Sequence, residues 1–131
     1  MIQIVQLQGT DKRLYELVAP LVMNPDVLRQ NHNYPFRTSE AFVWFVAVDE
    51  KKVIGFMPVE DKKKEYVINN YYIEGNNEAT LKALVEAVIA KTPDDRELTS
   101  VTLMEHCRLF KELGFSEGKI WTRYVKMKKD K

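Results

Sequence analysis

His106 and Cys107 are the neighbours in this sequence that look most like a base and a nucleophile, because an imidazole can activate a thiol. Adjacent residues of a helix, however, point about 100° apart and do not face each other. His106 also shares an apolar helical stripe with Leu109, Phe110 and Leu113. We therefore expect a half-buried, hydrogen-bonded histidine and no covalent catalysis by Cys107.

Tyrosine and glutamate side chains near the ends of predicted strands are the other candidates for acid and base chemistry. Tyr71, Tyr72 and Tyr124 each carry a hydroxyl that could protonate a leaving group. Buried tyrosines more often serve as core residues with a satisfied hydroxyl, so both interpretations stay open. Glu74 is the carboxylate best placed for a general base, although most carboxylates at strand ends simply solvate turns.

Asn69 and Asn70 interrupt the otherwise strand-like stretch Tyr66–Ile73, at positions where a packed strand favours apolar side chains. A β-bulge at this point would re-aim the two side chains and interrupt strand pairing, which is common next to functional sites. The alternative is regular alternation, in which one amide faces solvent and the other bonds to the backbone. The two hypotheses place these amides differently, and the sequence is compatible with both.

Hydrophobic periodicity predicts the elements that must position these groups. Ala41–Val48 is apolar at every position, which indicates a strand covered on both faces, and Val53–Met57 returns as its hairpin partner. Apolar residues at helical spacing predict helices that end at glycine or proline signals. The expected order is strand 2–7, helices 11–22 and 27–31, strands 41–48, 53–57 and 66–73, helix 78–91, strand 98–103, helix 106–113, and strands 120–121 and 124–127.

The segment from strand 66–73 through helix 78–91 to strand 98–103 predicts a right-handed crossover, which makes these two strands parallel. We therefore expect an α/β (α+β) fold with a central mixed, mostly antiparallel sheet and helices on both faces. If the parallel strands diverge, unpaired backbone groups at their carboxyl ends could bind an extended ligand that carries amides.

The composition of the 131 residues bounds the classes of function. The length, with 45% hydrophobic and 30% charged residues, is typical of one globular domain, and no repeat or linker divides residues 1–131. Lys and Arg number 20 against 19 Asp and Glu, so the net charge gives no reason to expect nucleic acid as a partner.

The cysteine content and the N-terminus indicate the compartment. A lone cysteine, Cys107, forms neither an internal disulfide nor a thiolate zinc site, and we expect no metal. Met1–Leu7 alternates apolar and polar residues, unlike a signal peptide, and no stretch approaches the roughly 20 apolar residues of a membrane span. These features favour a cytoplasmic protein without a membrane partner.

Three motifs follow one another along the chain. Phe45–Val48 and Val53–Phe56 form a hairpin that ends in glycine and an aromatic residue, and Asn70–Ile73 precedes the helix 79–88. His106–Phe115 is a helix closed by a Leu-Gly-Phe signature. Together they resemble the hairpin, the acetyl-CoA strand and helix, and the penultimate helix of the GNAT superfamily of acyl-CoA-dependent N-acyltransferases. The resemblance covers nearly the whole chain.

This resemblance implies an N-acetyltransferase that uses acetyl-CoA as co-substrate and acetylates a small-molecule or peptide amine by direct attack on the thioester. It implies that the pantetheine arm pairs with the strand backbone and that the pyrophosphate lies on N–H groups at the start of the next helix. Glu74 and Tyr124 are then the candidate catalytic residues. The implied cofactor-binding residues are Tyr72, Ile73, Gly75, Asn76, Asn77, Glu78, Ala79 and Thr80.

Two positions depart from the family pattern. Glu78 stands in the pyrophosphate turn, which normally carries a basic residue, and a carboxylate repels a pyrophosphate. Phe110 stands where many members carry the tyrosine that protonates the leaving thiolate, and phenylalanine has no proton to donate. These departures keep an alternative open, a catalytically inactive protein of this fold with a binding or regulatory role. A homodimer joined through the C-terminal strands is compatible with either function.

Overall fold

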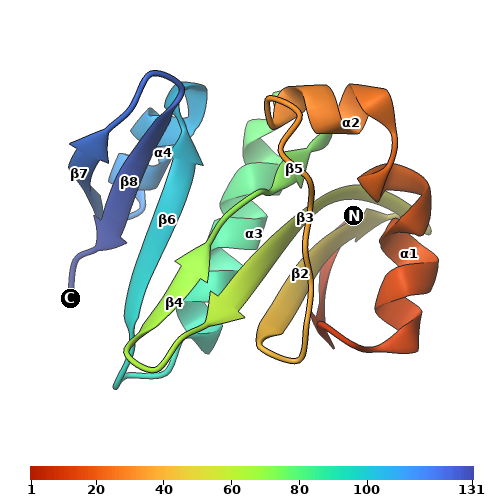
Figure 1. The fold of residues 1–131 in the computed structure, drawn as a ribbon, viewed down its shortest axis with the longest axis horizontal. Coiled ribbons are helices and arrows are strands. Elements are labelled where there is room, and N and C mark those ends of the chain that lie inside the picture. The colour runs from red at the N-terminus through yellow and green to blue at the C-terminus, as the bar shows by residue number, and fades with distance from the viewer.

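A computed structural model describes all of residues 1–131 (Figure 1). Its elements are β1 (Ile2–Gln8), α1 (Lys12–Val22), α2 (Pro25–Gln30), β2 (Phe42–Asp49), β3 (Lys52–Asp61), β4 (Glu65–Ile68), β5 (Tyr72–Ile73), α3 (Glu78–Lys91), β6 (Glu97–Leu103), α4 (Cys107–Glu112), β7 (Phe115–Ile120) and β8 (Tyr124–Lys129). The strands form one sheet in the order β1-β2-β3-β4-β6-β8-β7, and β5 pairs with β3. None of the helices has the length and apolar character needed to cross a lipid bilayer.

The central strand β2 is buried on both faces, as its unbroken apolar run predicts. Phe45 and Ala47 point into a core that α3 and α4 cover. Trp44 and Val46 point into a second core that α1 and α2 cover. The two pairs of helices therefore lie on opposite faces of the sheet, and the predicted layers are confirmed (Figure 1).

Side-chain caps fix where α2 and α3 begin. Asn24 Oδ1 accepts a hydrogen bond from the backbone N–H of Asp26 at 2.8 Å. Asn77 Oδ1 accepts one from the backbone N–H of Thr80 at 3.0 Å. Such a cap stabilises a helix by about 1 kcal/mol and satisfies a backbone donor that has no partner inside the helix.

The predicted strand 66–73 is divided into β4 and β5 by a break at Asn69–Tyr71. Asn70 has a φ of 57°, a left-handed conformation that asparagine adopts more readily than most residues and that a regular strand excludes. β3 runs past the break, because Val59–Asp61 pairs with β4 and Gly55–Phe56 pairs with β5. The two amides therefore mark an interruption of the strand, as the first of the two hypotheses predicts.

β4 and β6 are parallel neighbours, which confirms the predicted crossover through α3. Glu65–Ile68 pairs with Glu97–Ser100, and the pairing stops there. Beyond this point β5 pairs with β3, and Val101–Leu103 of β6 pairs with β8. The strands therefore diverge toward their carboxyl ends. The fold class, a mixed and mostly antiparallel sheet with helices on both faces, is confirmed.

The C-terminal part differs from the prediction in two places. The strand expected at 120–121 is β7, which already begins at Phe115. Most residues of this edge strand are polar and exposed, so it lacks the alternation of apolar and polar residues that predicts a strand. The helix expected over 106–113 begins instead with a 3₁₀ turn at Met104–His106 and ends at Glu112. Gly114, with a φ of 96°, closes it as the predicted left-handed residue.

Candidate functional site

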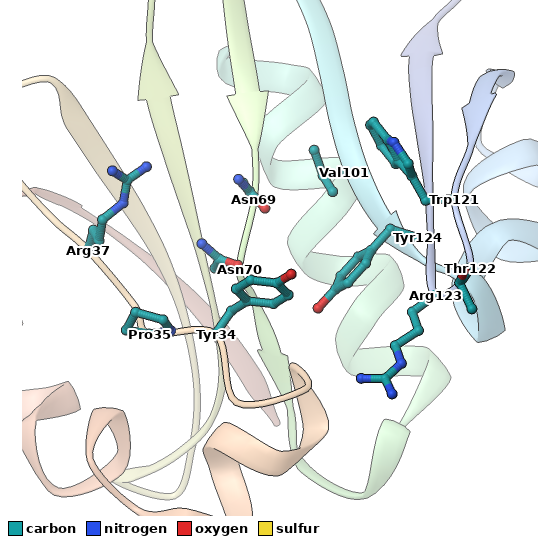
Figure 2. A pocket seen from close by; sticks show the side chains of 10 residues that line it. All are labelled: Tyr34, Pro35, Arg37, Asn69, Asn70, Val101, Trp121, Thr122, Arg123 and Tyr124. Atoms are coloured by element: carbon teal, nitrogen blue, oxygen red, sulfur yellow. The ribbon is translucent and has the colours of Figure 1, made fainter.

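A pocket of about 740 Å³ lies at the open end of the divergence (Figure 2). The break between β4 and β5 contributes two of its lining residues, Asn69 and Asn70, and β6 contributes Val101. The turn between β7 and β8 with the start of β8, Trp121–Tyr124, forms one wall, and the loop between α2 and β2 provides the opposite wall. Four segments that lie far apart in the sequence therefore converge on this pocket.

The amides of the strand break both line the pocket. Asn70 Oδ1 accepts a hydrogen bond of 2.8 Å from Nδ2 of Asn31, a residue that is only 1% exposed. The Asn69 carboxamide has no protein partner and points toward the middle of the pocket (Figure 2). Asn69 can therefore bind a polar group of a ligand without first losing an interaction of its own.

Tyr124, one of the two predicted catalytic residues, lies in the pocket wall. The single proton of its hydroxyl is shared between two acceptors of Asn31, the backbone oxygen at 3.1 Å and Oδ1 at 2.9 Å. The rings of His32 and Tyr34 pack edge-on against its ring. Burial, with a smaller contribution from Tyr34, raises the pKa of Tyr124 to about 12. Its hydroxyl therefore keeps its proton at neutral pH, which suits a general acid and not a base.

The edge of β5 that faces the divergence already has a hydrogen-bond partner within the protein. The backbone N–H of Ile73 donates to Gln30 Oε1 at 2.8 Å, and Gln30 Nε2 donates to the backbone oxygen of Ile73 at 2.6 Å. The side-chain amide of Gln30 thus takes the place of a neighbouring strand. This is the edge on which the sequence resemblance places the pantetheine arm, so a ligand there has to displace Gln30.

A buried hydrogen-bond chain bridges the divergence on the face covered by α3 and α4. The backbone N–H of Leu103, at the end of β6, donates to the Tyr71 hydroxyl at 3.1 Å, and that hydroxyl lies 2.8 Å from His106 Nδ1. Nε2 of His106 lies 2.9 Å from Asn76 Oδ1, which can only accept, so Nε2 carries the ring proton and donates to it. In this neutral tautomer Nδ1 accepts from the Tyr71 hydroxyl. This arrangement favours the core interpretation of Tyr71.

This chain of hydrogen bonds predicts that stability depends on pH, because His106 has to be neutral to accept from Tyr71. Burial lowers the pKa of His106 from its ordinary value of 6.5. Between the two pKa values the unfolded chain binds more protons than the folded one, so stability is complete above pH 6.5 and falls as the pH drops toward the folded value. Denaturant unfolding between neutral pH and about pH 5, above the range where carboxylates titrate, measures the slope.

The control for this experiment is the other histidine. His106→Gln is expected to flatten the slope above about pH 5, whereas His32→Gln is expected to retain it. An equal slope in the wild-type protein and in His106→Gln would contradict a neutral His106 in the fold.

The turn that carries most of the predicted cofactor-binding residues lies at the start of α3. Gly75 and Asn76 have φ values of 62° and 52°, and a side chain at Gly75 would meet nothing within 4 Å. The cap at Asn77 satisfies the N–H of Thr80, and the backbone oxygen of Asn77 accepts from Leu81. The backbone N–H groups of Glu78 and Ala79, which lie between Asn77 and Thr80, have no such partner within the protein.

Arg108 of α4 contributes a positive charge to this turn. Its guanidinium lies 3.3 Å from the Glu78 carboxylate, and it also pairs with Glu112 within α4. The negative charge that distinguishes the turn from the family pattern is therefore partly balanced within the protein.

Two other predicted residues do not line the pocket. The Glu74 carboxylate forms an ion pair of 3.0 Å with Lys52, whose pKa this hydrogen bond raises, and Glu74 does not line the pocket. The Tyr72 ring packs on Phe56 in the core below α1 and α2. The pocket therefore brings together Tyr124 and the strand-break amides, while Glu74 lies apart from them.

Phe110 and Cys107 belong to the core. Phe110 is fully buried and packs between the rings of Tyr71 and Phe115, so its position does not reach the pocket. Burial raises the pKa of the Cys107 thiol, which lies 3.7 Å from the backbone oxygen of Leu103. A protonated, buried thiol agrees with the expectation that Cys107 is no nucleophile. No three His, Cys, Asp or Glu side chains come together in a way that could hold a metal ion.

Several residues of the site carry no recognisable signal in the sequence. Gln30 and Asn31 are polar residues at the end of a short helix, where most such residues face solvent. Arg37 and Arg123 belong to loops that no periodicity describes. The break at Asn69–Asn70 did have a signal, two amides in an apolar run, and Tyr124 had one as a tyrosine in a predicted strand.

Neither a protein-family model nor a curated protein sequence matches the chain. Solved structures do match it. Escherichia coli ElaA superposes with a TM-score of 0.71 at 11% identity, over 99% of this chain and 100% of that chain. An acyl-CoA N-acyltransferase from Pseudomonas aeruginosa gives 0.71 at 12% identity over the same shares. A GNAT family acetyltransferase from Elizabethkingia anophelis, solved with acetyl-CoA bound, gives 0.61 at 15% identity, over 97% of this chain and 94% of that one.

A likeness at these identities establishes a shared fold, whereas function resides in the site. The matches extend over nearly the whole of both chains in each comparison. The chain therefore has the GNAT fold.

Proposed function

We propose that this chain is an acyl-CoA-dependent N-acetyltransferase that transfers an acetyl group from acetyl-CoA to an amine held in the pocket. The observation that carries the proposal is the divergence of β4 and β5 from β6 with a pocket at its open end. The strand edges can bind the extended arm of an acyl donor, and the pocket can hold the acceptor amine next to it. Such positioning is a large part of catalysis by direct attack.

The residues of the turn fit the donor in part. Free N–H groups at Glu78 and Ala79, the open space at Gly75 and the guanidinium of Arg108 suit a pyrophosphate at the positive end of α3. The edge at Ile73 fits the pantetheine arm once Gln30 has rotated away. Acetyl-CoA supplies the activated thioester in this reaction.

Tyr124 is the residue that we assign to proton transfer. Its hydroxyl is protonated at neutral pH and lies in the pocket wall, where it can donate to a leaving thiolate after releasing Asn31. Glu74 stays a predicted base. Because it pairs with Lys52 outside the pocket, it can take the proton of the amine only through water.

The second candidate is a catalytically inactive protein of the GNAT fold that binds a partner or regulates it. The pairing of Gln30 with Ile73 favours this function, since the edge that would bind pantetheine is occupied. The Glu78 carboxylate in the turn favours it as well. The two candidates differ in one measurable property, the affinity for acetyl-CoA.

The affinity test uses two alanines of α3. Ala79 and Ala90 are both exposed, but Ala79 lies in the predicted pyrophosphate turn and Ala90 near the other end of the helix. We expect acetyl-CoA to raise the Tm of the wild-type protein, because a ligand at about 100 times its Kd adds about 2.7 kcal/mol of stability. Ala79→Trp is expected to abolish this shift, and Ala90→Trp to leave it unchanged.

Titration calorimetry with acetyl-CoA and with desulfo-CoA gives the affinities directly. Binding to the wild-type and Ala90→Trp proteins but not to Ala79→Trp would support the cofactor turn. Absence of binding to a folded wild-type protein at millimolar acetyl-CoA would contradict the transferase and leave the inactive protein as the better function.

A further inference from the structure

The pocket carries positive charge and no negative charge. Arg37 and Arg123 both line it, and none of its lining residues is an aspartate or a glutamate. The two arginines come from opposite sides, with Tyr34 and Tyr124 between them (Figure 2). The whole chain is nearly neutral, with 20 basic and 19 acidic residues, so the positive charge of the pocket does not reflect the overall composition.

Both guanidinium groups lack an ion-pair partner. Arg29, Arg96 and Arg108 each pair with a carboxylate elsewhere on the surface. Arg37 and Arg123 do not, although Glu60 shares a small adjoining depression with Arg37. A guanidinium presents a fork of donors that matches a carboxylate, so these two are free to bind one from a ligand.

Aromatic rings form the walls between the arginines. Trp121 is 40% exposed and Tyr34 is 57% exposed, and both line the pocket with Tyr124. The Lys119 ammonium lies 5.4 Å from the Trp121 ring centroid and adds further positive charge to this side. Such walls suit a ligand with a flat apolar body.

The Asn69 carboxamide supplies the remaining group that an amine requires. Its side chain has no protein partner, and its oxygen can accept a hydrogen bond from an N–H. Because no carboxylate lines the pocket, a ligand with several positive charges would meet two arginines with nothing to balance it. The lining therefore suits one amine on a molecule that also carries an anion.

We infer that the acceptor pocket selects an amine with an aromatic body and a carboxylate. The carboxylate pairs with Arg37 or with Arg123, the rings of Tyr34, Trp121 and Tyr124 contact the body, and the Asn69 amide accepts from the amine. That the bound amine is an acetyl acceptor rests on the proposed function. The selection of the ligand by charge and shape is independent of acetyl-CoA, and binding in its absence tests it.

Three small probes separate the groups of such a ligand. L-phenylalanine carries the ring, the amine and the carboxylate, hydrocinnamate lacks the amine, and phenethylamine lacks the carboxylate.

The readout is the indole N–H signal of Trp121 in a nitrogen–proton correlation spectrum. Trp44 serves as the internal control, because it is 2% exposed and its indole N–H donates to Thr38. We expect phenylalanine and hydrocinnamate to bind at least about tenfold more tightly than phenethylamine, since hydrogen bonds to charged groups are the stronger ones.

Arginine variants locate the anion. The double variant Arg37→Gln with Arg123→Gln is expected to lower the affinity for phenylalanine and hydrocinnamate by about tenfold or more and to leave that for phenethylamine unchanged. Arg13→Gln is the matched control, because Arg13 is exposed on α1, has no ion pair and lies outside the pocket lining. A thermal melt of each variant confirms that it is folded.

Three outcomes would overturn the inference: phenethylamine binding as tightly as phenylalanine, affinity for the carboxylates unchanged in the folded double variant, or no shift of the Trp121 signal by any probe at millimolar concentration. Failure of the proposed function looks different. In that case acetyl-CoA does not bind, while the probes still discriminate by charge.

Discussion

Tyr71→Phe is expected to lower the free energy of unfolding by about 2 to 4 kcal/mol, a large effect for the loss of one oxygen atom. The hydroxyl accepts from the buried N–H of Leu103 and donates to His106. Phenylalanine keeps the ring contacts but leaves the donor at the end of β6 and the acceptor on His106 without partners. An orphaned buried polar group costs more than the net value of a hydrogen bond.

Tyr66→Phe is the matched control for this substitution. Tyr66 lies in β4, and its hydroxyl has no hydrogen bond within the protein, while its ring packs near the Arg96 guanidinium. The same chemical change there is expected to alter stability by less than about 0.5 kcal/mol. Urea unfolding of both variants measures the difference. Equal small losses in the two proteins would show that the buried chain from Leu103 to Asn76 contributes little.

Gln30→Ala is expected to raise the affinity for acetyl-CoA by about tenfold. The wild-type protein has to break two hydrogen bonds between Gln30 and Ile73 before the edge of β5 can pair with a ligand. Net values near 1 kcal/mol for each bond correspond to roughly a tenfold or greater change in Kd. The same variant is expected to lose about 1 to 2 kcal/mol of stability in the absence of the ligand.

Gln8→Ala provides the control, because Gln8 also donates to a backbone oxygen, that of Glu40, but at a site remote from the divergence. Calorimetry with acetyl-CoA compares the three proteins. Equal affinity of the wild-type and Gln30→Ala proteins would mean that the cofactor does not use the Ile73 edge. No binding to either protein would favour the inactive member of the fold.

Much of the fold follows from local patterns. The unbroken apolar run Ala41–Val48 and the stripe that ends near Lys91 predict a buried strand and an amphipathic helix whose bounds differ little from β2 and α3. The parallel relation of β4 and β6 follows from chain connectivity, because a crossover through a helix leaves no other direction. β7 was largely missed, since an edge strand with exposed polar residues has no apolar face to reveal it.

The site was less predictable, for a physical reason. Tyr124 and the amides at Asn69–Asn70 lie in or beside strands, so the hydrophobic pattern of those strands predicts where they are. Gln30 bonds to a segment distant in sequence, and Arg37 lines a pocket with other distant segments, which no local window describes. Gln30 meets Ile73 across 43 positions of the chain, so its role became visible only once the elements were packed. The ion pair of Glu74 with Lys52 likewise joins residues distant in sequence, and it became visible only in the packed structure.

The short ladder of β4 with β6, Glu65–Ile68 against Glu97–Ser100, is the sole strand pairing between the two halves of the sheet. A small pivot about this seam would change the aperture at the far end while the register inside each half stays intact. The buried hydrogen bonds from Leu103 through Tyr71 to His106 span the same gap, so such a pivot would have to stretch or break them. A single substitution among these residues would therefore change how easily the gap widens without changing the strand pairing inside either half.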